Sequence, residues 1–226
     1  MFPLRDNIPS RSWPLVTVLI IAANFYLFYQ ELLLGDTALT RFIHTWGLVP
    51  ADFLARLARE PFQYTTYLPL VTNLFLHGGW LHILGNMWYL WIFGDNIEDS
   101  LGKGRFLYFY LLCGVIANAA QVIVDPGSTV PTVGASGAIS GLLGAYLMLF
   151  PQARIATLPP LFPLIPILQI PALLFLPLWF FIQLQQGAAA LFMAGANIAW
   201  WAHIGGFAAG FVLVKIVRPR RHYRYN

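Results

Sequence analysis

Residues 134–150 read GASGAISGLLGAYLMLF, and the rest of the chain is best interpreted outward from this stretch. Ser136 stands between Gly134 and Gly137, directly after a turn-rich loop at 125–131. The run from Gly137 to Phe150 has 14 mostly apolar residues. As a helix it would be about 21 Å long, which is short of the roughly 30 Å hydrocarbon core of a bilayer. The stretch therefore predicts a serine at the N-terminus of a membrane helix that begins below the membrane surface.

The composition indicates a polytopic membrane protein. Of the 226 residues, 58% are hydrophobic and only 10% are charged, whereas a soluble domain carries about 25% charged residues. Several apolar runs are long enough to cross a bilayer. The single cysteine, Cys113, excludes an intrachain disulfide.

Six membrane spans are expected, at about 13–33, 74–94, 106–124, 136–150, 161–182 and 197–217. The fifth contains four prolines and should be irregular. The connection between the first two spans, about 35–70, mixes charged and aromatic residues. That mixture is typical of short amphipathic helices lying in the membrane interface. The sequence thus predicts one domain, 1–226, with an all-α, six-transmembrane-helix bundle fold.

The basic residues predict the orientation of the chain. Six spans put both termini on one side of the membrane. With the termini in the cytoplasm, ten Lys and Arg residues lie on the cytoplasmic side and three on the other, which satisfies the positive-inside rule. The basic C-terminal tail is expected to set topology and meet anionic headgroups rather than bind nucleic acid. No cleavable signal peptide is expected, because the first apolar run is too long.

Four polar residues are predicted to meet in the outer half of the membrane. His82 and Asn86 lie in the early turns of the second span, Ser136 begins the fourth, and His203 lies about two turns into the sixth. Polar side chains at such depth usually face the bundle interior or a wet cavity. Ser136 and His203 supply a nucleophile and a general base for acyl transfer. His82 and Asn86 share one helix face and can donate hydrogen bonds to an oxyanion.

No carboxylate is placed to complete a catalytic triad. Asp95 is 13 residues beyond His82, about 20 Å along the helix, and Asp125 lies in a loop. The predicted catalytic unit is therefore a Ser136–His203 dyad.

At these residues the chain resembles the rhomboid family of intramembrane serine proteases. Residues 134–137, GASG, are similar to the nucleophile motif of the family. Residues 82–86, HILGN, are similar to its His-x-x-x-Asn element, and 202–206, AHIGG, to its base-bearing sixth helix. Many members carry a tyrosine four residues after the nucleophile, stacked on the histidine, where this chain has Ser140. Trp200 and Trp201 are candidate supports for the His203 ring instead. The arginine-containing motif of the family in the first loop is not recognisable here.

The resemblance implies a multi-pass membrane protease of a prokaryotic cell membrane. Its substrates would be transmembrane segments of other membrane proteins. They would enter the site from the lipid bilayer and be cut near their outer ends. It implies no metal, no cofactor and no nucleic-acid partner.

Three other interpretations remain open. A catalytically inactive rhomboid-like protein would bind transmembrane clients without cutting them. A small transporter or channel would favour ionisable residues across the full membrane depth. Taken alone, Ser136 among glycines is a common helix-packing residue, and His203 alone is equally compatible with a structural role. His77 is interpreted as structural, anchoring the long loop.

Access to a recessed serine requires a movable element. Pro171 and Pro177 interrupt the fifth span, which makes it the expected gate. The following segment, 187–195, is apolar and bounded by glycines. We expect Phe192 and Met193 to cover Ser136, with Gly187 and Gly195 as hinges.

Overall fold

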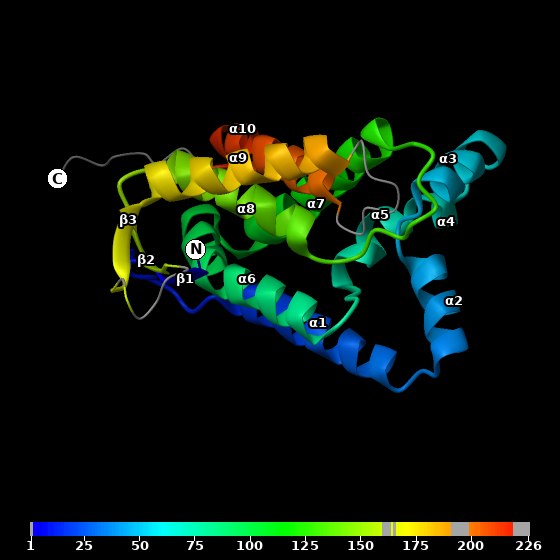
Figure 1. The fold of residues 1–226 in the computed structure, drawn as a ribbon, viewed down its shortest axis with the longest axis horizontal. Coiled ribbons are helices and arrows are strands. Elements are labelled where there is room, and N and C mark those ends of the chain that lie inside the picture. The colour runs from blue at the N-terminus through cyan, green and yellow to red at the C-terminus, as the bar shows by residue number, and fades with distance from the viewer. Residues whose placement is uncertain (1, 160–163, 165, 191–198, 219–226) are drawn as a thin grey trace.

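The computed structural model describes residues 2–159, 164, 166–190 and 199–218. Its elements are β1 (Phe2–Arg5), α1 (Leu15–Leu32), α2 (Asp36–Trp46), α3 (Pro50–Arg59), α4 (Tyr64–Tyr67), α5 (Pro69–Thr72), the 3₁₀ helix η1 (Asn73–Phe75), α6 (Trp80–Leu101), α7 (Lys103–Val124), α8 (Ser136–Leu149), β2 (Arg154–Leu158), β3 (Leu168–Pro171), α9 (Ala172–Ala190) and α10 (Trp200–Val217). The long helices lie side by side in one bundle (Figure 1).

The predicted class, a helical membrane bundle, is confirmed. Within the described part of the chain, α1, α7, α9 and α10 are long and apolar enough to cross a membrane. Helix α8 is shorter, and α6 carries polar residues along its length, among them His82, Asn86 and Asp95. The count of six spans therefore stays a prediction.

Helix α8 lies at the centre, and glycines let its neighbours approach it closely. Every residue from Gly137 to Tyr146 is buried. A Cβ atom added to Gly144 would overlap the Phe207 carbonyl oxygen, and one added to Gly210 would overlap that of Gly141. The backbones of α8 and α10 therefore touch, because small residues permit such approach. This contact sets the distance between Ser136 and the helix that carries His203.

The expected fifth span, 161–182, is wrong in its bounds. Helix α9 starts only at Ala172 and continues to Ala190, and Pro171 is the last residue of β3. Pro171 lacks a backbone N–H and stands directly before the first residue of α9, where no intrahelical hydrogen bond is required. Pro177 remains inside α9. The second span also differs: α6 begins at Trp80 and runs to Leu101.

A small antiparallel sheet, which the sequence did not predict, closes one end of the bundle (Figure 1). Its strand order is β1-β2-β3, with Phe2 opposite Leu158 and Ile155 opposite Ile170. The Asp6 carboxylate accepts hydrogen bonds from the Tyr146 hydroxyl and from Nδ2 of Asn96. Burial raises the pKa of the Asp6 carboxyl, and the bond from Tyr146 opposes that shift. The N-terminal segment thus joins the sheet to α6 and α8.

The connection between α1 and α6 lies at the opposite end of the bundle from the sheet (Figure 1). As expected, it contains short helices, α2 to α5. Leu48 exchanges two backbone hydrogen bonds with Thr132, at 3.0 and 2.8 Å. The connection therefore holds the loop that leads into Ser136.

Candidate active site

Ser136 is the first residue of α8, and the loop before it is fixed by its backbone. Gly134 has φ +117°, a conformation that side chains other than hydrogen rarely tolerate. Its N–H donates to the carbonyl oxygen of Asn73 at 2.8 Å. A Cβ at this position would lie 2.6 Å from Nε2 of His82. Glycine is therefore required at position 134 for two reasons. Its backbone has a positive φ, and the His82 ring occupies the space that a Cβ would take.

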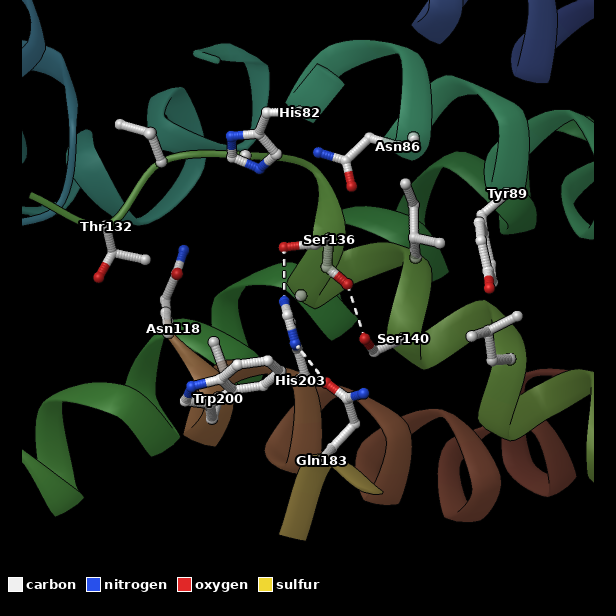
Figure 2. Close-up of a pocket in the computed structure, with 18 of the residues that line it drawn as sticks. His82, Asn86, Tyr89, Asn118, Thr132, Ser136, Ser140, Gln183, Trp200 and His203 are labelled. Atoms are coloured by element: carbon white, nitrogen blue, oxygen red, sulfur yellow. Dashed lines mark hydrogen bonds between the residues drawn. The ribbon is translucent and has the colours of Figure 1, made fainter. Parts of the chain in front are cut away.

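The structure brings Ser136 and His203 together from α8 and α10 (Figure 2). Oγ of Ser136 lies 2.8 Å from Nε2 of His203, within hydrogen-bond distance. Both side chains are partly buried. Ser140, one turn further along α8, donates its hydroxyl to the Ser136 carbonyl oxygen at 2.7 Å.

The other ring nitrogen of His203 faces α9. Oε1 of Gln183 lies 2.9 Å from Nδ1 of His203 (Figure 2). The ring of Trp200 meets the His203 ring edge-on, with centroids 5.9 Å apart, and Trp179 lies at 6.3 Å. Of the two tryptophans expected to support the ring, Trp200 is thus in place. No ring contact between Trp201 and His203 is found in the described part of the chain.

His82 presents its Nε2 to the nucleophile loop. The backbone N–H of Gly78 donates to Nδ1 of His82 at 3.4 Å. Because Nδ1 accepts, the ring proton of neutral His82 lies on Nε2. That nitrogen faces Gly134, as the position of an added Cβ shows. The Nε2–H group therefore points toward the entry of α8.

Asn86 is held by His77. Nδ2 of Asn86 lies 3.0 Å from Nε2 of His77, and an amide nitrogen can only donate, so His77 accepts. The backbone N–H of His77 donates in turn to the buried Glu31 carboxylate, at 3.3 Å to each oxygen. A Cβ on Gly134 would lie 3.3 Å from the same Nδ2. One amide hydrogen of Asn86 is thus used by His77, and the second is left for the nucleophile loop.

One cavity of about 580 Å³ is lined by Ser136 and His203 together with His82, Asn86 and Gln183. It extends below Ser136 to residues two turns deeper in the bundle, Tyr89, Leu143 and Trp179. A second hollow, of about 320 Å³, shares His82 and Thr132 with the first and is bordered by Gln121 and Asp125. The cavity is large enough to hold side chains of a peptide next to the hydroxyl.

Comparison with known proteins identifies the family. The Rhomboid domain family matches residues 64–220. The chain belongs to the rhomboid family. It is 33% identical to the putative rhomboid protease YdcA of Bacillus subtilis (strain 168), over 69% of this chain and 70% of that protein. It is 32% identical to the rhomboid protease GluP of the same organism, over 59% of this chain but 24% of GluP. It is 30% identical to the presenilin-associated rhomboid-like protein A, mitochondrial, of Danio rerio, over 80% of this chain and 46% of that protein.

At the site of this rhomboid, one residue, Gln183, and one contact, that of the His77 ring, were missed in the sequence. Gln183 was not predicted, although an amide in an apolar helix is a signal in itself. His77 was interpreted as structural, an anchor of the long loop, and its ring also contacts the Asn86 amide, which was not predicted. The expected cover, Phe192 and Met193, and the expected hinge Gly195 lie outside the described residues. Gly187 lies inside α9 rather than after it, because the alanines at 188–190 continue the helix.

Proposed function

We propose that this rhomboid is an intramembrane serine endopeptidase that cuts transmembrane segments of other membrane proteins. The observation that supports the proposal most directly is the 2.8 Å contact between Ser136 Oγ and His203 Nε2. A nucleophile and a base within hydrogen-bond distance are the minimum unit for acyl transfer. Relatives named as rhomboid proteases support the same reaction class.

In the proposed reaction, Ser136 Oγ attacks the carbonyl carbon of the scissile bond while Nε2 of His203 takes the hydroxyl proton. The imidazolium then gives that proton to the leaving amine, which frees the new N-terminus. A water molecule, deprotonated by the same nitrogen, attacks the acyl-enzyme and releases the new carboxylate. The hollow bordered by Gln121 and Asp125 adjoins the cavity and offers a polar space from which that water can come.

The negative charge on the carbonyl oxygen would be stabilised by two side chains of α6. Nε2–H of His82 and the free amide hydrogen of Asn86 both face Gly134, two residues before Ser136. The first N–H groups of α8 have no partner within the helix, and its positive dipole end lies at the same place. Preorganised donors of this kind are worth more in a site that excludes bulk water.

The proposed orientation puts the sheet and both termini in the cytoplasm, as the basic residues predict. The α2–α5 connection and the mouth of the cavity then lie on the outer side. Substrates would enter sideways from the lipid and be cut near their outer ends. A prokaryotic cell membrane remains our expectation, and the relatives include both a bacterial and a mitochondrial protein.

The test is labelling of the purified protein by a fluorophosphonate in detergent. We expect the wild type to be labelled at Ser136 rather than Ser140, as located by mass spectrometry of the peptide. Ser136→Ala and His203→Ala should lose labelling and should cut a reconstituted transmembrane substrate below about a thousandth of the wild-type rate, because the two groups act as a unit. Turnover above about a tenth of the wild-type rate in either variant would refute the dyad.

The alternative is a rhomboid-like protein that binds transmembrane clients without cutting them. It predicts that the folded wild type binds such a segment but neither reacts with the fluorophosphonate nor releases a product. Fluorophosphonate labelling and turnover of the transmembrane substrate therefore separate the two functions.

A further inference from the structure

Gln183 is a buried amide on a helix that otherwise faces lipid and apolar side chains. Its exposed fraction is 6%, whereas Gln185 and Gln186 on the same helix are exposed. Burying an amide is costly unless it is hydrogen-bonded. The bond from His203 Nδ1 to Oε1 meets that need, so the inward orientation of Gln183 has a specific partner.

With its amide oxygen toward the ring, Gln183 favours the tautomer of His203 that carries the proton on Nδ1. A carbonyl oxygen can only accept, so Nδ1 must be the donor. In the neutral ring Nε2 is then left with its lone pair, and it lies 2.8 Å from the Ser136 hydroxyl. The aromatic contacts of Trp179 and Trp200 can hold the plane of the ring, but they do not choose between its two tautomers. Gln183 does.

We propose that Gln183 is the positioning residue that fixes the tautomer of His203, and that the dyad is aligned only while α9 lies against α10. The inference rests on the proposed protease function for its kinetic consequences. In that reaction Gln183 does for His203 what the carboxylate does in a catalytic triad, but without a charge. It acts from a helix other than those that carry the nucleophile and the base.

The dependence on α9 follows from its contacts on either side of Gln183. Gly187 lies one turn later on the same helix face, where an added Cβ would meet Ile204 at 3.3 Å and Trp200 at 3.4 Å. Six residues before Gln183, Pro177 removes one hydrogen bond from the helix. If the outer part of α9 moves away to admit a substrate, Oε1 leaves His203. The base is then unaligned until α9 returns.

The surroundings of His203 make a charge at position 183 easy to detect. The other titratable side chains lining the cavity are His82 and Tyr89, both on α6. The described lining residues include no carboxylate, lysine or arginine. A carboxylate placed at position 183 would therefore be the one negative group next to the ring.

The first experiment compares three variants by the rate of fluorophosphonate labelling. Gln183→Leu keeps the volume but removes the acceptor, Gln183→Glu keeps an acceptor, and Gln186→Leu is the matched control on the exposed face. We expect Gln183→Leu to react about 10- to 100-fold more slowly, part of the 10²–10⁴ that a general base contributes. Gln183→Glu should react within about fivefold of wild type, and the acidic limb of its pH profile should move to higher pH, because the carboxylate stabilises the imidazolium. Gln186→Leu should match wild type.

Wild-type labelling by Gln183→Leu, or an unmoved acidic limb in a Gln183→Glu variant that is as slow as Gln183→Leu, would overturn the proposal. Nitrogen-15 NMR of ring-labelled histidine gives a reading that does not depend on catalysis. Nδ1 of His203 should be protonated in wild type, and Gln183→Leu should shift the proton toward Nε2; an unchanged tautomer would also overturn it. If wild type itself reacts with no fluorophosphonate, the proposed function fails, while the tautomer still tests Gln183.

The second experiment tests the link to α9. Gly187→Leu should push the outer part of α9 from α10 and slow labelling about as much as Gln183→Leu, and the double variant should be no slower than either. Gly187→Ala, whose one tight contact is with the flexible end of Ile204 at 3.3 Å, should react within about threefold of wild type. Fully additive losses, or a wild-type rate for Gly187→Leu, would show that α9 packing and His203 alignment are independent.

Discussion

Helix α10 is contacted by α8 and by α9, and the two contacts are built differently. Between α8 and α10 the backbones touch: a Cβ on Gly206 would overlap the Gly137 carbonyl oxygen. Between α9 and α10 the contact is made by side chains, with the Phe180 and Phe207 rings stacked at 4.7 Å and Gln183 bonded to His203. The first contact can hardly slide or open without breaking the core, whereas side chains can separate and meet again.

The difference assigns different tasks to the two contacts. The α8–α10 contact fixes the distance from Ser136 to His203, which the proposed reaction needs to be constant. The α9–α10 contact completes the environment of His203 and lies on the helix that Pro177 weakens. A recessed site can thus have a permanent pair of reacting groups and an adjustable third helix. The predictions below test that division, beginning with the largest effect.

Gly210→Ala should have the largest effect, because it attacks the rigid contact. The new Cβ would overlap the Gly141 carbonyl oxygen, so the two backbones must separate. We expect turnover to fall at least about 100-fold, since a displacement near 1 Å at the reacting atoms costs that much, and the melting temperature to fall. Gly104→Ala on α7, where an added Cβ meets nothing within 4 Å, is the control. Wild-type turnover in Gly210→Ala would contradict the rigid pairing.

Replacing both His82 and Asn86 by Ala should come next, because α6 takes part in neither contact. Removing one oxyanion donor from a serine protease can cost about 10²–10³ in rate, and two donors that substitute for each other should cost less singly. We expect losses in acylation rate of about fivefold for each single variant and about 100-fold for the double variant, which is more than the product of the two single losses. Single-turnover labelling measures the rate, and an unaffected double variant would show that the oxyanion lies elsewhere.

The site residues carried by the two helices of the α8–α10 contact are the ones that the sequence could predict. Ser136 and His203 each stand next to small residues at a fixed depth in a span, so motif and span position together locate them. The residues of the α9–α10 contact were harder to predict. Three glutamines occur within 183–186, and only the packing of α9 decides which one faces inward. The sheet depends on pairing of Phe2–Arg5 with a strand more than 140 residues away, and local patterns do not encode such pairing.

His77→Leu tests whether α6 donors need support of their own. Without the Nε2 acceptor, the Asn86 amide loses the bond that directs it. We expect acylation to slow about three- to tenfold, the value of one hydrogen bond. The loss should not add to that of Asn86→Ala, because both act through one amide. His77→Gln, which keeps an acceptor, is the matched variant; equal losses in His77→Gln and His77→Leu would instead indicate that the ring only fills space.

Pro177→Ala should have the smallest effect, and the effect should depend on the substrate. Alanine restores the N–H that Pro177 lacks, so α9 becomes a continuous helix that is harder to bend away from α10. A transmembrane substrate needs that movement, and its turnover should fall about two- to fivefold, the value of roughly one hydrogen bond. A small fluorophosphonate needs far less space, so its labelling rate should stay within error of wild type. Pro171→Ala, at the end of β3 and outside α9, should leave the ratio of the two rates unchanged. If Pro177→Ala slowed both reactions equally, the proline would act on the site rather than on entry, and the α9–α10 contact would be as fixed as the one between α8 and α10.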